Sequence, residues 1–320
     1  MSMINAALVE SFDEPPHFRS VPEPVAAPGQ EVVDVLAVGV HRATRAIAAG
    51  EHYASADALP ATAGVDAVVR RADGSLAFVL APRTGTLAER IAVDPAYAIP
   101  VPAESDPAVL VATMNPALSS WVALRDRVPF TTGQSVLVIG ATGNAGSMAV
   151  KVAKYLGAGH VIAAGRNQAR LEELLSEGAD ETIALTDASD ASDASATTYA
   201  KVAADVDVVI DYVWGPPTEL AMHAILQART DHTRLLDWVH TGGMGGLDIN
   251  LPSHALRSNA LRIQGSGFGS IALEACALDE LAAAIAAGAM TVRPRPFPLA
   301  EVERAWAHQD AYGERTVIAL

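Results

Sequence analysis

Three evenly spaced glycines are the residues of this sequence best suited to holding a phosphate. Gly140, Gly143 and Gly146 follow a short apolar run, 135–139, and precede an amphipathic run, 147–156. A phosphate is bound by backbone N–H groups at a helix N-terminus, and glycine allows the close approach that this requires. The strand–turn–helix order favours a dinucleotide-binding turn over a glycine turn that only packs a helix on a strand. The residues predicted around a pyrophosphate are Gly140, Thr142, Gly143, Asn144, Ala145 and Gly146.

The end of the next apolar run, 160–164, indicates which dinucleotide is bound. A site for NAD places Asp or Glu there, about 20 residues after the glycines, on the ribose 2′-hydroxyl. This chain has Gly165, Arg166 and Asn167 instead. Gly165 is expected to leave room for a 2′-phosphate, Arg166 to pair with it, and Arg170 to assist from one turn further along. The sequence therefore favours NADPH, with a solvated Arg166 at a helix start as the alternative.

Alternating strand and helix patterns around these residues predict a doubly wound parallel sheet. Further apolar runs are expected as strands of the same sheet, and 168–178 as a helix that ends at a glycine. The low-complexity segment Asp187–Ser195 is expected to be a surface loop. The additional strands are predicted at 182–185, 205–211, 235–239 and 261–265.

The elements that flank this sheet have a different pattern. Residues 1 to about 110 carry short apolar or alternating runs separated by Pro and Gly, with a hairpin turn at Asp73–Gly74. Asp106 before Pro107 predicts the start of a helix that reaches residue 124 and is broken or kinked near Pro116. The Pro-rich tail is expected to form a strand, a helix and a strand that return to the first domain. We predict a β-rich domain, 1–112 with 285–320, and a nucleotide-binding domain, 113–284.

Composition excludes several classes of function. The chain has 320 residues, of which 50% are apolar and 18% charged, as in a compact globular protein. Its net charge of −15 argues against a nucleic-acid partner. A single cysteine, Cys276, excludes an intramolecular disulfide and a multi-cysteine zinc site. Neither a signal peptide nor an apolar run of about 20 residues is evident, so we expect a cytoplasmic protein with no membrane partner.

Taken together, these motifs resemble the medium-chain dehydrogenase/reductase superfamily, and within it the zinc-free quinone oxidoreductase and enoyl reductase branch. The resemblance is carried by Val136–Gly146, by Ala163–Asn167 and by Asn115-Pro116 before Ser119-Ser120-Trp121. Weaker similarities lie at 37–40, 64–66, 85–89 and 265–268. The resemblance implies a GroES-like catalytic domain, a Rossmann domain and a homodimer formed through the Rossmann sheet. It adds as cofactor-binding candidates Asn115, Ser119, Thr241, Gly242, Gly243, Gly267 and Phe268.

The resemblance also bears on zinc. Zinc-dependent relatives place Cys, a Gly-His-Glu unit and a further Cys around the metal. By motif order, this chain has His41 in the first position, Gly64-Val65-Asp66 in the second and a residue near Asn115 in the third. Valine cannot ligate a metal, and asparagine is a poor zinc ligand. We predict no metal.

Without a metal, catalysis requires hydrogen bonds to the acceptor and close positioning of the hydride. His41 and Tyr53 are the candidate proton or hydrogen-bond donors, although each has an ordinary structural role as its alternative. Where the branch usually has Val-Asn-Pro, this chain has Val40-His41-Arg42. A His-Arg pair suits an anionic or strongly polar small-molecule substrate better than a plain quinone.

The expected reaction is hydride transfer from NADPH to a quinone or an α,β-unsaturated carbonyl. Two alternatives stay open. The same scaffold supports carbonyl or imine reduction, because each needs only a positioned nicotinamide. The chain could also be a non-catalytic NADPH-binding sensor. Fold alone does not identify a substrate.

Overall fold

The computed structural model describes residues 2–80, 84–185, 192–267 and 277–320. The chain divides into two compact units: Met1–Asn115 with Ala277–Leu320, and Pro116–Cys276. The sequence placed these boundaries at 112/113 and 284/285. The second boundary differs because helix α8 (Leu278–Ala286) packs near strand β8 (Ala98–Pro100) of the first unit.

The second unit is built on a parallel sheet of six strands within its described residues. The strand order is β11-β10-β9-β12-β13-β14, which is the order of a Rossmann fold. All five pairings are parallel, so the carboxyl ends of the strands share one edge. The bounds are β9 Ser135–Ile139, β10 His160–Gly165, β11 Glu181–Ala184, β12 Val208–Asp211, β13 Leu236–His240 and β14 Leu261–Gly265.

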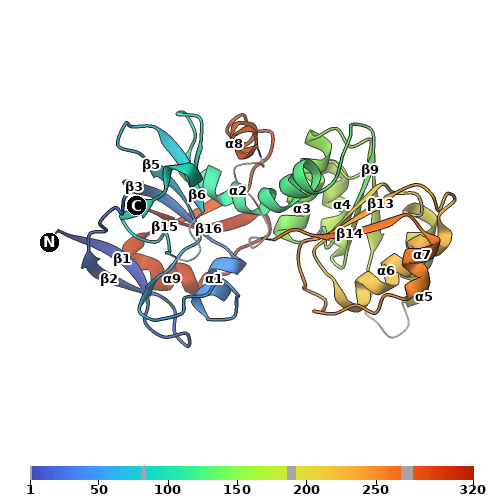
Figure 1. The fold of residues 1–320 in the computed structure, drawn as a ribbon, viewed down its shortest axis with the longest axis horizontal. Coiled ribbons are helices and arrows are strands. Elements are labelled where there is room, and N and C mark those ends of the chain that lie inside the picture. Colours follow the sequence, from blue (N-terminus) through green and yellow to red (C-terminus); the bar gives the residue numbers. More distant parts are fainter. Residues whose placement is uncertain (1, 81–83, 186–191, 268–276) are drawn as a thin grey trace. The chain divides into compact units, whose positions relative to one another are not determined.

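Helices cover both faces of this sheet (Figure 1), with α3 and α4 on one side and α5, α6 and α7 on the other. Strand residues alternate between the faces, so that Leu137, Ile139 and Ile162 join the core under α5 and α6. Helix α5 begins at Ser192, inside the segment Asp187–Ser195 that the sequence predicted to be a loop. The loop prediction is therefore wrong from residue 192 onward. Tyr199 of this helix is fully buried in the core, and that contact holds the polar segment in place. The bounds are α3 Asn144–Tyr155, α4 Gln168–Glu177, α5 Ser192–Val202, α6 Gly215–Ala228 and α7 Ser253–Ser258.

The first unit is β-rich, as predicted. Strands β2, β1 and β4 form one small antiparallel sheet, and a larger sheet has the order β15-β16-β3-β5-β6-β8 with β7 also paired to β3. The tail returns to this sheet as expected: Thr316 of β16 lies opposite Val40 of β3. The strand bounds are β1 Met3–Val9, β2 His17–Pro22, β3 Glu31–Val40, β4 Ala61–Thr62, β5 Asp66–Arg70, β6 Leu76–Leu80, β7 Arg90–Val93, β15 Arg293–Pro298 and β16 Glu314–Ala319. The helix bounds are α1 Arg42–Ala48 and α9 Val302–Ala307, with short 3₁₀ turns at Pro95–Tyr97 and Leu299–Glu301.

One long helix contains the boundary between the units. Helix α2 (Pro107–Val122) begins after Asp106, whose carboxylate accepts the N–H groups of Ala108 and Val109. A π-helical turn, Ala123–Arg127, continues it. The continuous helix is long and apolar enough to cross a membrane by composition, with a mean hydropathy of 1.3. However, 72% of that window is buried inside the protein, which is the pattern of a core helix.

Candidate functional site

The glycine turn lies at the carboxyl end of β9 and leads directly into α3. Gly143 is the N-cap of α3 and is exposed, and as a glycine it has no side chain to cap the N–H groups of the first turn. Ser147 donates its N–H to the Gly143 carbonyl, which closes the first helical turn. The N–H groups of Asn144, Ala145 and Gly146 thus begin a twelve-residue helix with its positive dipole end at the edge of the sheet. This arrangement fits a pyrophosphate.

Two glycines are required by close packing. A Cβ on Gly146 would lie 2.2 Å from the Gly140 carbonyl oxygen, so only glycine lets the helix approach the turn. A Cβ on Gly165 would lie 2.5 Å from the Thr142 side chain. Glycine at 165 therefore allows the close approach of Thr142, and its role beside a 2′-phosphate stays a prediction.

The two arginines after β10, Arg166 and Arg170, lie in different surroundings. Arg166 is exposed at the strand end, and no carboxylate occupies 165–167. Asn167 caps α4 by accepting the N–H of Arg170. Arg170 itself is buried, and its guanidinium pairs with Glu173 and Glu177. The predicted role of Arg170 in binding a 2′-phosphate is therefore wrong, because two carboxylates of α4 already hold its charge.

A buried carboxylate organises the ends of β12 and β13. Asp211 is fully buried and accepts the N–H groups of Val213 (2.8 Å) and Trp214 (3.0 Å) on one oxygen. Its other oxygen accepts the Thr218 hydroxyl (2.7 Å) and the Trp238 indole N–H (3.0 Å). Four donors without charge thus fix the turn after β12, in which Trp214 has a φ of 55°. Sequence reasoning missed this role, because only the folded sheet brings Trp238 to Asp211.

The hydroxyl groups of Ser119, Tyr212 and Thr241 lie together beside that turn. The Tyr212 hydroxyl lies 2.8 Å from Ser119 Oγ, which joins α2 to the strand ends. Burial raises the pKa of Tyr212 to about 12, against the opposite effect of hydrogen bonds from Ser119, Ser120 and Thr241. Tyr212 therefore stays protonated at neutral pH. The structure thus brings the predicted residues Ser119 and Thr241 together around Tyr212.

The loop after β13 is tied to the same turn. Thr241 donates its hydroxyl (2.9 Å) and its N–H (2.8 Å) to the Asp211 carbonyl, and a Cβ on Gly242 would lie 3.1 Å from the Tyr212 carbonyl. The ring of His240 lies 4.2 Å from that of Trp214, and burial lowers the pKa of His240. Gly243 is exposed at the end of this loop. The loop is thereby fixed at the carboxyl edge of the sheet.

In the first unit, His41 is buried at the start of α1. Its Nδ1 accepts the N–H of Thr44 (3.3 Å), and its Nε2 lies 3.4 Å from Asp66 Oδ1. Because Nδ1 is an acceptor here, the proton of a neutral His41 is on Nε2 and faces Asp66. This geometry favours a helix cap over an acid that delivers protons to a substrate. The catalytic role of His41 stays a prediction.

The other predicted residues have varied settings. Tyr53 is 67% exposed, with its ring 4.1 Å from that of His52. Asn115 is half-buried on α2, and Gly267 is exposed after β14. Phe268 lies outside the described residues. Proton-donor and cofactor roles for these residues stay predictions.

The residues at the catalytic zinc position of relatives do not fit a zinc ion. Val65 is fully buried and has no ligand atom. His41 and Asp66 supply only two ligating groups, whereas zinc needs three or four. Within the described part of the chain, one other group could hold a metal: His308, Asp310 and Glu314.

Comparisons with known proteins agree with this architecture. The family described as "Zinc-binding dehydrogenase" matches residues 145–283. A probable NADPH-dependent quinone reductase of Emericella nidulans is 29% identical, over 98% of this chain and 99% of its own length. The quinone oxidoreductase of Thermus thermophilus, solved alone and with NADPH, is 26% identical with a TM-score of 0.77, over 99% of this chain and 100% of its own. An alcohol dehydrogenase superfamily protein of Novosphingobium aromaticivorans is 25% identical with a TM-score of 0.78, over 99% of each chain.

Proposed function

We propose that the chain, an oxidoreductase similar to members of the medium-chain dehydrogenase/reductase superfamily, is a zinc-independent, NADPH-dependent reductase. Its acceptor is a quinone or an α,β-unsaturated carbonyl compound. The observation that carries the proposal is the uncapped start of α3 at the carboxyl edge of a sheet in the Rossmann order. Bound NADPH supplies the hydride.

The chain's own residues hold the cofactor in this proposal. The first-turn N–H groups of α3 bind the pyrophosphate, and Arg166 pairs with the 2′-phosphate. The lack of a carboxylate at 165–167 supports NADPH over NADH, because an acidic residue there would repel a phosphate. The loop Thr241–Gly243, fixed by Asp211, borders the site.

The acceptor needs a hydrogen-bond donor in the absence of a metal. Tyr212 joins His41 and Tyr53 as a candidate. Its hydroxyl is held by Ser119 at the carboxyl edge of the sheet, where ligands bind in open α/β folds. Its raised pKa keeps the proton in place at neutral pH, so that Tyr212 donates and does not ionise.

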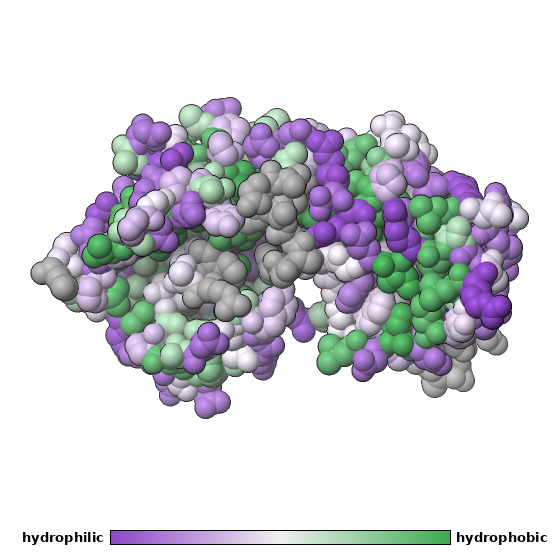
Figure 2. Space-filling model, viewed as in Figure 1, coloured by the Kyte–Doolittle hydropathy of each residue, from purple (hydrophilic) through white to green (hydrophobic). Residues whose placement is uncertain are grey.

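The proposed assembly is a homodimer through the edge of the Rossmann sheet. Strand β14 ends the strand order and pairs only with β13 among the described residues. An edge strand offers unpaired backbone groups to a second copy. Apolar side chains gather on the face of this unit seen in Figure 2, and Leu247 and Leu256 are 87% and 51% exposed. Sedimentation of the native chain beside Ile263→Lys, a substitution on β14, tests the dimer.

The reductase proposal is tested by following absorbance at 340 nm with NADPH and NADH against 1,4-benzoquinone and an α,β-unsaturated ketone. Faster oxidation of NADPH is expected with at least one acceptor. Replacement of Arg166 by Ala should raise KM for NADPH at least about tenfold and leave NADH unaffected, because one charge-assisted contact is lost.

The matched control is Arg257→Ala, which removes an exposed arginine of α7 in the same unit. Equal effects of the two substitutions would assign the change to net charge and contradict the role of Arg166. Tight NADPH binding without oxidation of any acceptor would sink the reductase proposal. Activity that is abolished by a zinc chelator would contradict zinc independence.

A further inference from the structure

A cavity of about 360 Å³ lies in the first unit, between the turn that joins β1 to β2, the end of α1 and helix α9. The volume is within the range of small-molecule sites. Its lining combines aromatic rings with carboxylates, and proteins use this combination to bind organic cations. The aromatic residues are Phe12 and Trp306, and the acidic residues are Asp13, Glu14 and Glu303.

Packing holds both aromatic rings in place and leaves part of each accessible. Phe12 lies against Gly50 at the end of α1, where a Cβ would be 3.0 Å from the phenyl ring, and Phe12 is still 39% exposed. Trp306 is partly buried against the core of this unit. The guanidinium of Arg45 lies 5.4 Å from the centre of the Trp306 ring, so this indole already contacts one cation of the protein itself.

Two of the three carboxylates face one histidine. Glu14 and Glu303 lie 3.4 and 3.3 Å from the two ring nitrogens of His17. Burial alone would raise the pKa of Glu303, but hydrogen bonds from its own N–H and from that of Phe18 lower it, so that the carboxylate stays charged at neutral pH. The third carboxylate belongs to Asp13, which is exposed at the turn.

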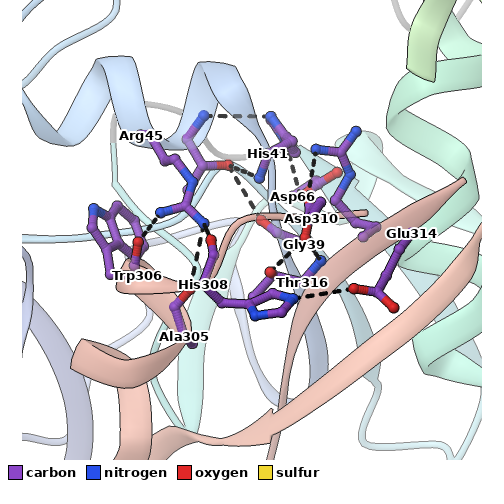
Figure 3. A network of polar contacts seen from close by, with 12 residues as sticks. Gly39, His41, Arg45, Asp66, Ala305, Trp306, His308, Asp310, Glu314 and Thr316 are labelled. Atoms are coloured by element: carbon purple, nitrogen blue, oxygen red, sulfur yellow. Dashed lines mark hydrogen bonds and ion pairs between the residues drawn. The ribbon is translucent and has the colours of Figure 1, made fainter. Parts of the chain in front are cut away.

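Arg45 is the one cation among the described residues that line the cavity. Its guanidinium donates to the carbonyls of Trp306, Ala305 and His308 at the end of α9 (Figure 3). These hydrogen bonds hold it against the backbone of the helix end. Burial lowers the pKa of Arg45, and the nearby Asp310 opposes this effect. The charge of Arg45 therefore offsets at most one of the three carboxylates.

The neighbouring cations do not remove the remaining negative charge. Arg19 lies near Glu303 but pairs with Glu10, with 2.7 Å between the two groups. His17 offsets one carboxylate when it is protonated and none when it is neutral. Three carboxylates against Arg45 and a protonated His17 leave one negative charge, and two remain when His17 is neutral. The net charge of −15 for the chain further favours a cation.

We propose that this cavity binds a small quaternary ammonium ion. The ammonium group lies against the accessible parts of Phe12 and Trp306, and its charge faces Asp13, Glu14 and Glu303. A quaternary ammonium has no N–H group to donate, so aromatic faces and nearby carboxylates attract it without a hydrogen bond. The proposal concerns the β-rich unit and does not depend on the proposed reductase function.

The first test is calorimetric titration of the full chain with choline and with 3,3-dimethyl-1-butanol, in which carbon replaces the charged nitrogen. Saturable binding of choline near one equivalent is expected, at least about tenfold tighter than binding of the neutral alcohol. Added potassium chloride should weaken choline binding, because the carboxylates are partly exposed and salt screens their charge.

Substitutions then test the lining. Glu303→Gln should weaken choline binding about threefold or more, as expected for a partly exposed charge. Trp306→Phe should keep more of the affinity than Trp306→Leu, because phenylalanine retains an aromatic face. The matched control is Glu301→Gln at the start of α9, since Glu301 pairs with Arg304 and does not line the cavity. Asp13→Asn, at an exposed turn, keeps the proposal testable if Glu303→Gln does not fold.

Each result has a defined meaning. No saturable heat with choline would overturn the site. Equal affinities for choline and the neutral alcohol would show a groove for apolar groups and overturn recognition of the charge. Equal losses in the Glu303 and Glu301 variants would assign the effect to net charge and overturn the role of the cavity.

Discussion

The two units each bury a carboxylate completely, and the two carboxylates are held in opposite ways. Asp211, at the end of β12, accepts four hydrogen bonds from groups without charge. Asp66, at the start of β5, has no hydrogen-bond partner on either oxygen among the described residues, and the His41 ring lies 3.4 Å away. Burying a carboxylate is costly unless hydrogen bonds or opposite charges compensate it.

Asp211 therefore fixes the conformation of the backbone, whereas Asp66 interacts with a nearby charge. Asp211 fixes the N–H groups of Val213 and Trp214 and thereby the turn beside the predicted nucleotide site. Asp66 faces the His41 ring and lies near the charge of Arg315, and no backbone N–H of the described residues donates to it. Substitutions that keep shape but remove charge should therefore act very differently in the two places.

The largest expected effect is that of Asp211→Asn. The amide keeps one acceptor oxygen, but its NH₂ group faces the Trp238 indole N–H, which cannot reverse its role. We expect a loss of about 3 kcal/mol in the free energy of unfolding in urea. Asp231→Asn, at an exposed turn, is the control and should change stability little. A loss below about 1 kcal/mol would contradict the organising role of Asp211.

The next effect concerns Tyr212, which follows Asp211. Its raised pKa means that the folded protein keeps the phenolic proton to higher pH than the unfolded chain does. Its stabilising contribution is therefore complete below about pH 10 and is lost as pH rises through about 12. Tyr212→Phe should reduce the alkaline loss of stability by roughly 2–3 kcal/mol over this interval. Identical pH profiles for the two proteins in urea unfolding would disprove it.

A smaller effect is expected for Asp66→Asn. The substitution removes no hydrogen bond and relieves a buried charge, while His41 and Arg315 lose a favourable neighbour. These changes oppose each other, so the unfolding free energy should shift by about 1 kcal/mol or less. A loss comparable to that of Asp211→Asn would show that the two carboxylates are equivalent.

The smallest effect should come from His240→Phe. Burial lowers the pKa of His240 in the folded state, so its contribution is present above pH 6.5 and is lost as pH falls through the folded pKa. Because the ring is only half-buried, the difference between wild type and variant should be a few tenths of a kcal/mol. Thermal unfolding between pH 5 and 7 measures it, and a larger loss at pH 7 than at pH 5 is the expected pattern for the variant.

Local patterns of sequence predicted much of this molecule. The buried run 135–139, the glycine turn and the next helix and strand lie where expected, because each is encoded by neighbours a few residues apart. The Asp73–Gly74 hairpin joins β5 and β6 for the same reason. The ion pairs of Arg170 could also have been predicted from the sequence, because Glu173 and Glu177 lie three and seven residues further on, on the same side of α4.

What only tertiary structure decided depends on contacts between distant residues. Ser119 meets Tyr212 across 93 positions, and β16 pairs with β3 across most of the chain. Asp211 finds Trp238 because two parallel strands are adjacent, and Arg42, Arg45 and Arg315 line one cavity because the tail returns to the first unit. Periodicity and turn residues specify an element locally, whereas the partner of a buried charge or hydroxyl is set by strand order and packing, which no short window of sequence contains.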